Sequence, residues 1–144
     1  TTATNVHQLR DLIRERMDVR QRTLSLLFQS FGYKHGVPTD ADFVFDARCL
    51  PNPHWEPALR PLTGRDREIS DYLRAQPAAM TYLDQLRDFL DYWIPAFERE
   101  NRSYLTIAIG CTGGQHRSVW LAECLAAHFR RQREGIALRH RELT

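Results

Sequence analysis

The chain has 144 residues, of which 20 are Lys or Arg and 18 are Asp or Glu, giving a formal net charge of +2. This length suits one domain with its own core, and a charge so near neutrality does not by itself indicate nucleic-acid binding. No apolar run approaches the length of a membrane span, so we expect a cytoplasmic protein without a membrane partner. The three cysteines lack C-x-x-C spacing, which argues against a disulfide framework or a structural zinc site.

The first 22 residues predict a connector helix that precedes the domain. Thr4 or Asn5 can cap this helix, and apolar residues recur after them at helical spacing. These apolar residues are Val6, Leu9, Leu12, Ile13 and Met17. We therefore divide the chain into a connector over residues 1–22 and a single α/β domain over residues 23–144.

Within the predicted domain, apolar runs typical of strands alternate with segments of helical spacing. Strands separated by helices favour a parallel sheet, so we expect an α/β fold with a small, mostly parallel sheet flanked by helices. Pro51 and Pro53 predict an extended loop after the second strand. The predicted strands cover residues 23–31, 43–48, 105–109 and 136–141, and the predicted helices cover residues 64–75, 78–100 and 119–129, the last helix ending at Gly135.

The segment with the clearest chemistry, residues 111–118, lies between the third strand and the following helix. Gly113 and Gly114 allow positive φ angles and a close approach of the backbone to a ligand. The backbone N–H groups of such a loop, followed by a helix N-terminus, point donors and a positive dipole end at one place. Arg117 can add a bidentate fork. The segment therefore predicts a phosphate-binding loop between a strand and a helix, and an ordinary glycine-rich turn is the alternative.

Polar residues follow all four predicted strands. Ligands of parallel sheets bind outside the carboxyl ends of the strands, so we expect these residues to share one pocket. Lys34 is the only lysine among the 20 basic residues, and its compact ammonium group would suit a phosphate. The candidate ligand-binding residues are Lys34, His35, Gly36, Asp46, Arg48, Cys111, Thr112, Gly113, Gly114, Gln115, His116, Arg117, Ser118, Arg139, His140 and Arg141.

Two more residues with ligand-binding chemistry, His54 and Trp55, follow the second strand. Either could stack on a sugar or on a base. The favoured interpretation is the plainer one, in which Trp55 packs the proline-rich loop onto the domain.

Residues 111–118 also have the spacing C-x5-R-[ST], which is similar to the phosphate loop of cysteine-dependent phosphatases. In that interpretation Cys111 is the nucleophile, with its pKa lowered by the helix N-terminus, and Arg117 holds the phosphate oxygens. Gly110 stands where those phosphatases have His, and no general acid is evident. We therefore expect a binding domain that is not an enzyme, and keep the phosphatase as the alternative.

Four segments together closely resemble the C-terminal domain of the RapZ family, bacterial RNase adapter proteins related to YvcJ. These segments are residues 30–36, 45–55, 101–118 and 139–141, and the similarity covers nearly everything from about residue 23 onward. The resemblance implies a domain that binds small regulatory RNAs of amino-sugar synthesis and presents one of them to ribonuclease E. It also implies a homo-oligomer of several subunits that senses glucosamine-6-phosphate.

The resemblance also bears on ligands. Full-length family members carry an N-terminal P-loop domain, which we expect to be absent from this chain, so no cofactor and no ATP binding are expected. The expected ligand is a sugar phosphate or another anion, with no metal and no catalytic residue. The residues expected to contact RNA are Lys34, His35, Arg117, Arg139 and Arg141.

Overall fold

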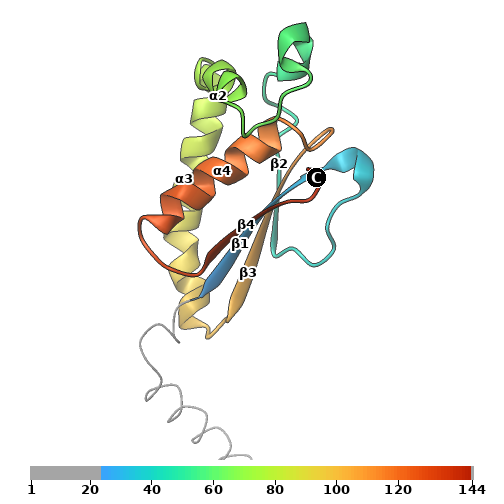
Figure 1. Ribbon diagram of the computed structural model, residues 1–144. Helices are drawn as coiled ribbons and strands as arrows, with labels where there is room; N and C mark the ends of the chain where they lie inside the picture. Colours follow the sequence, from blue (N-terminus) through green and yellow to red (C-terminus); the bar gives the residue numbers. More distant parts are fainter. Residues whose placement is uncertain (1–23, 144) are drawn as a thin grey trace, which may run out of the picture.

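The computed structural model describes residues 24–143, so the predicted connector helix over residues 1–22 lies outside the described part. Four strands form one sheet in the order β2-β3-β1-β4. Every neighbouring pair is parallel, which confirms the predicted α/β class (Figure 1). The strands are β1 (Ser25–Gly32), β2 (Phe43–Asp46), β3 (Tyr104–Cys111) and β4 (Ile136–His140), and the helices are α2 (Arg67–Arg74), α3 (Pro77–Arg99) and α4 (Arg117–Arg130).

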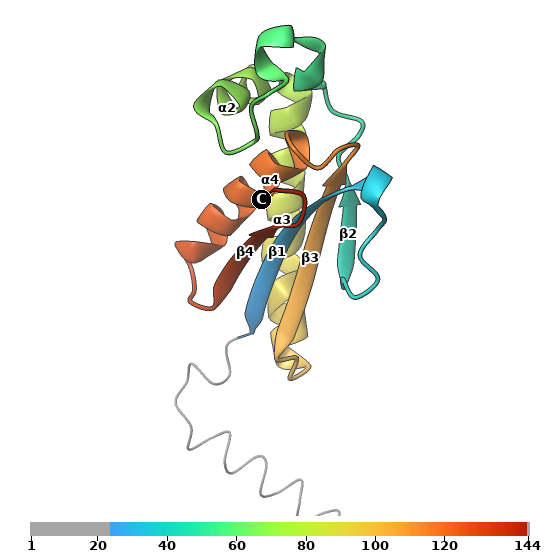
Figure 2. The same ribbon diagram turned by 45° about the vertical axis from the view of Figure 1, so that its right-hand side comes forward.

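The core lies between one face of the sheet and the helices. Successive strand residues point to opposite faces, and Leu26, Phe28 and Ile107 belong to the same buried cluster as the apolar side of α3 and α4. Phe28 stacks on Phe129 of α4 with ring centroids 5.6 Å apart. The buried residues of α3 recur at the spacing of one helix face; they are Ala79, Leu83, Leu86, Leu90 and Ile94. Figure 2 shows α3 and α4 behind the sheet and the opposite sheet face turned forward.

Two predictions about connections are wrong. The loop after β2 is not extended throughout, because it contains two short 3-10 turns, η3 (Pro53–Trp55) and η4 (Pro57–Leu59). Proline fixes a φ angle that suits the first position of a helical turn, and each turn begins with one. Helix α4 ends at Arg130 rather than at Gly135; Gly135 instead takes a φ of 75° in the loop before β4.

Among residues 24–143, the longest helix is amphipathic and no helix is apolar enough over a sufficient length to cross a membrane.

Candidate functional site

All four strands point in the same direction, so their carboxyl ends meet at one edge of the sheet. The register places Gly32 of β1 opposite Cys111 of β3 and Asp46 of β2 opposite Gly110. Ser30 of β1 lies opposite His140 of β4. The segments that follow the four strands are therefore brought together at this edge, as the sequence predicted from the strand assignments.

The loop from β3 to α4, residues 111–118, presents a row of free backbone donors. Within residues 24–143, no backbone N–H group from Gly113 to Val119 donates a hydrogen bond, and the next one, that of Trp120, bonds to the carbonyl of His116 at 3.0 Å. In the part of the chain that the structure describes, no side chain caps the N-terminus of α4. The first N–H groups of any helix lack an intrahelical acceptor. Together with those of the preceding loop they form a row of donors at the N-terminus of α4, an arrangement suited to an anion.

Two glycines explain why the loop can sit where it does. Gly114 has a φ of 75°, which a residue with a side chain rarely adopts. Gly32, at the end of β1, lies so close to the loop that a Cβ atom on it would be 2.5 Å from the carbonyl carbon of Gly113. The β3–α4 loop is thus held against the end of β1 by backbone contact.

Arg117 is 4% exposed and has no carboxylate partner in the described part of the chain. Its Nη1 donates to the carbonyl oxygens of Arg48 (2.9 Å) and Leu50 (3.0 Å), and its Nη2 approaches the hydroxyl of Thr112 at 3.5 Å. The buried Nε has no hydrogen-bond partner within residues 24–143. The direct hydrogen bonds of Arg117 thus go only to neutral oxygens, and the nearest negative charge that acts on it, Asp46, is paired with Arg48. A buried positive charge held in this way favours an anion nearby.

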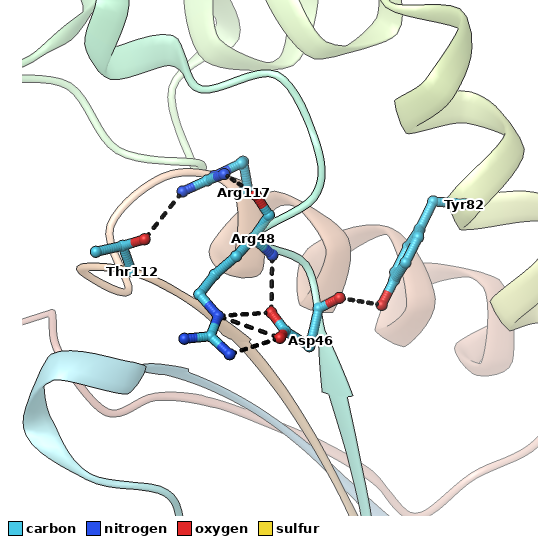
Figure 3. Close-up of polar contacts among 5 residues, drawn as sticks. All are labelled: Asp46, Arg48, Tyr82, Thr112 and Arg117. Atoms are coloured by element: carbon cyan, nitrogen blue, oxygen red, sulfur yellow. Dashed lines mark hydrogen bonds and ion pairs between the residues drawn. The ribbon is translucent and has the colours of Figure 1, made fainter.

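Asp46 and Arg48 form a pair at the end of β2, beside Arg117 (Figure 3). Arg48 donates from Nη2 to Asp46 at 2.7 Å, and its guanidinium lies 3.8 Å from the centre of the Tyr33 ring. These bonds hold the pKa of the Asp46 carboxyl below its usual value. The Tyr82 hydroxyl donates to the Asp46 carbonyl at 2.6 Å; burial, followed by the nearby Cys49 and Asp46, raises the pKa of Tyr82 to about 12.

Lys34 and the residues after β4 lie next to the β3–α4 loop, on the side of β1. The Nζ of Lys34 lies 3.9 Å from where a Cβ of Gly113 would be, and the Lys34 backbone donates to the Thr112 carbonyl at 3.2 Å. Glu142 accepts from the N–H of Gly32 at 2.9 Å and from Arg141. Burial alone would raise the pKa of Glu142, but these bonds and the nearby His35 outweigh it, so the pKa lies below its usual value.

Four predicted site residues use their side chains to hold the loop. His116 donates from Nε2 to the Leu62 carbonyl at 2.7 Å, and burial lowers its pKa. Gln115 donates to the Glu142 carbonyl at 3.0 Å. The sulfur of Cys111 lies 3.1 Å from the Ser118 hydroxyl, and both residues are buried.

The residues predicted on β4 separate onto opposite faces. His140 lies between the Ser30 hydroxyl (2.7 Å) and the Glu123 carboxylate (3.0 Å), while Arg139 is exposed. Arg141 donates to the Gly36 carbonyl and lies over the Phe31 ring. Sequence reasoning missed Tyr33, Tyr82 and Glu142, because none of these side chains gives a signal until its partners in the fold are known.

The fold and the site define the class: a parallel α/β domain with a donor-rich loop between a strand and a helix at the carboxyl edge of the sheet. The chain belongs to the family described as the RapZ C-terminal domain, whose family model matches residues 24–144. The resemblance noted in the sequence is thereby confirmed.

Relatives support the same assignment. A nucleotide-binding protein of Alkalilimnicola ehrlichii is 62% identical over 143 residues, which cover 99% of this chain and 50% of the relative. A nucleotide-binding protein of Thioalkalivibrio sulfidiphilus is 62% identical over 146 residues, which cover 100% of this chain and 51% of the relative. A nucleotide-binding protein of Aliivibrio fischeri is 50% identical over 144 residues, which cover 99% of this chain and 51% of the relative. The chain spans about half the length of the curated relatives it matches.

Proposed function

We propose that this chain is the metabolite-sensing and small-RNA-binding part of an RNase adapter protein. In this proposal it binds a sugar phosphate, glucosamine-6-phosphate, at the β3–α4 loop. It also binds small regulatory RNA and presents it to ribonuclease E, as part of a cytoplasmic homo-oligomer. The family assignment supports the regulatory role, and the chemistry of the loop supports the ligand.

The observation that carries the ligand proposal is the coincidence of two unsatisfied groups. Among residues 24–143, the N–H groups from Gly113 to Val119 at the N-terminus of α4 have no acceptor, and the guanidinium of Arg117 lies buried beside them with no carboxylate hydrogen-bonded to it. Donors at a helix N-terminus and an arginine fork are both suited to phosphate oxygens. Lys34 adds a second cation at the same loop.

Titration calorimetry with glucosamine-6-phosphate and with inorganic phosphate tests this site. Replacing Lys34 by Ala removes a charge-assisted hydrogen bond and is expected to weaken sugar-phosphate binding by about 1.5 to 3 kcal/mol. Arg130→Ala is the matched control, because Arg130 is exposed at the opposite end of α4. Wild-type affinity in Lys34→Ala would remove Lys34 from the site, and absence of binding in the unaltered chain would refute the ligand proposal.

The RNA proposal has a separate test, the dependence of affinity on salt. Lys34, His35, Arg117, Arg139 and Arg141 are the proposed RNA contacts. Each phosphate contact contributes about 0.7 to 0.9 to the slope of log affinity against log salt concentration. Filter binding of a small regulatory RNA over a salt series is expected to give a steep slope that Arg139→Ala and Arg141→Ala reduce. A chain that binds no RNA at low salt contradicts the proposal.

A cysteine-dependent phosphatase is the second candidate, and one observation favours it: Cys111 and Arg117 frame a loop of free donors. Against it, Cys111 is 2% exposed, and Gly110 stands where those phosphatases have His. The contact of the Cys111 sulfur with the Ser118 hydroxyl at 3.1 Å does not discriminate, because a hydroxyl donor would stabilise a thiolate. Burst release of product from an aryl phosphate, lost in Cys111→Ser but kept in Cys124→Ser, would make the phosphatase the better assignment.

A further inference from the structure

The loop from β2 to α2 carries an exposed tryptophan at its tip. Trp55, in the turn η3, is 69% exposed, so the interpretation that it packs the loop onto the domain is wrong. The chain's two other described tryptophans differ: Trp120 is 2% exposed in the core, and Trp93 on α3 is 46% exposed. Single exposed apolar side chains are common on protein surfaces, so the surroundings of Trp55 decide whether its indole suits a partner.

The loop holds its shape without the indole of Trp55. The Asn52 side chain accepts a bond from the His54 N–H at 3.0 Å, and Arg60 donates from Nε to the His54 carbonyl at 2.7 Å. Pro53 is buried. These bonds fix the turn that presents Trp55, so the ring is available for a partner.

Both ends of this loop are fastened to the β3–α4 loop. At the start, Arg117 donates to the carbonyl oxygens of Arg48 and Leu50. At the end, His116 donates to the Leu62 carbonyl, and the N–H of Gly64 donates to the Gln115 carbonyl at 2.8 Å. The tip with Trp55 is therefore positioned by the same residues that form the proposed anion site.

The neighbours of Trp55 indicate the chemistry of its partner. His54 and Arg60 are exposed beside it, and His54 lies near enough to His116 to help lower the pKa of that imidazole. The exposed Glu56 is the acidic residue next to Trp55. Trp55 thus lies among polar groups of both signs. An open aromatic face in a polar setting fits a stacked nucleobase, whereas a protein partner would favour an apolar surround that excludes water.

We propose that the indole of Trp55 is a stacking platform for an unpaired base of single-stranded RNA, held beside the anion site at the carboxyl edge of the sheet. The stacking needs no reading of base edges, so it tolerates any sequence and leaves specificity to other contacts. This inference rests on the proposed RNA-binding function and adds the residue and the RNA feature that it recognises.

The test uses the whole chain and a single-stranded oligouridylate about eight nucleotides long, a length within the usual range of one binding site. Trp55→Ala is expected to raise the Kd about 5- to 150-fold, and Trp55→Phe, which keeps an aromatic face, far less. Trp93→Ala is the matched control, because it also removes an exposed indole, and its Kd is expected to equal that of the unaltered chain.

A second oligomer separates the contribution of the bases from that of the sugar-phosphate backbone. For a ribose-phosphate oligomer of equal length without bases, the Kd is expected to be the same for Trp55→Ala and the unaltered chain. Equal loss with both oligomers, or no loss with either, overturns the stacking role while leaving the RNA proposal in place. If the unaltered chain does not bind oligouridylate at all, the stacking proposal falls, and the salt series with a small regulatory RNA decides the RNA proposal separately.

Discussion

Two arginines at opposite ends of the sheet are held in different ways. Arg133, in the loop before β4, donates from Nη1 and Nη2 to the two carboxylate oxygens of Glu98 at 3.0 and 2.9 Å. Glu98 also accepts from the N–H of Leu24, next to β1. Arg117, at the carboxyl edge, is more deeply buried and donates to carbonyl oxygens and weakly to a hydroxyl.

The difference separates a structural charge from one that is available to a ligand. At the amino edge, one carboxylate neutralises Arg133 and joins the end of α3 to β1 and to the loop before β4, so the pair stabilises the fold. At the carboxyl edge, no carboxylate among residues 24–143 forms an ion pair with Arg117, and the nearby Asp46 is already paired with Arg48. A bound anion would therefore stabilise the charge of Arg117 further. Substitutions at the two ends should therefore affect different measurements.

The largest effect on stability is expected at Gly32, where the end of β1 and the β3–α4 loop are in backbone contact. In Gly32→Ala the new Cβ would lie 2.5 Å from the carbonyl carbon of Gly113 and 2.9 Å from the nitrogen of Gly114. Neither backbone can yield easily, so we expect a loss of about 3 kcal/mol in the free energy of unfolding. Urea denaturation measures it, with Gly113→Ala as the control, since its Cβ would meet nothing closer than 3.8 Å.

The next effect is on anion binding. Arg117→Met keeps much of the side-chain length but removes the charge, and we expect it to weaken phosphate binding by about 2 kcal/mol. Arg133→Met, at the opposite edge, is expected to leave phosphate binding unchanged. Calorimetric titration with phosphate decides, and equal affinities in both variants would show that Arg117 has no role in the site.

The free energy of unfolding should be affected in the reverse order, more by Arg133→Met than by Arg117→Met. Arg133→Met leaves the Glu98 carboxylate with no cationic partner and is expected to lower the free energy of unfolding by about 1.5 kcal/mol. This value lies between those of surface pairs and fully buried pairs, since Arg133 and Glu98 retain 16% and 25% side-chain exposure. Arg117→Met should cost less, because the loss of its bonds to the carbonyl oxygens of Arg48 and Leu50 is offset by the removal of a buried charge that no carboxylate bonds directly among residues 24–143. A larger loss for Arg117→Met than for Arg133→Met would contradict the comparison.

The smallest effect concerns pH. Burial lowers the pKa of His116 below the unfolded value of 6.5, so the unfolded chain binds a proton that the folded chain does not. The contribution of His116 is complete above about pH 6.5 and is lost as pH falls below it, by at most about 1.4 kcal/mol per pH unit. Thermal unfolding of His116→Gln, which can still donate to Leu62, should depend less on pH from 6.5 downward; an unchanged dependence would exclude His116 as the cause.

Most of the fold followed from local pattern. Apolar runs and helical spacing gave the strands and helices of residues 24–143 in the right order, and alternation of the two gave the parallel sheet. Boundaries moved by a few residues, as for β1 and α4, because helix and strand ends depend on bonds to distant segments. The 3-10 turns after β2 were missed because proline suits both extended and helical-turn backbone.

The sequence by itself determined which residues stand at the ends of the strands, because strand order along the chain and a common direction suffice to bring Gly32, Asp46, Cys111 and His140 to one edge. Only the tertiary structure decided what each side chain does there. The same residue type ends in opposite roles: Arg133 meets a carboxylate from α3, and Arg117 meets carbonyl oxygens from the loop after β2. Partners far apart in sequence set burial, charge compensation and exposure, as with Trp55, and no local pattern encodes them.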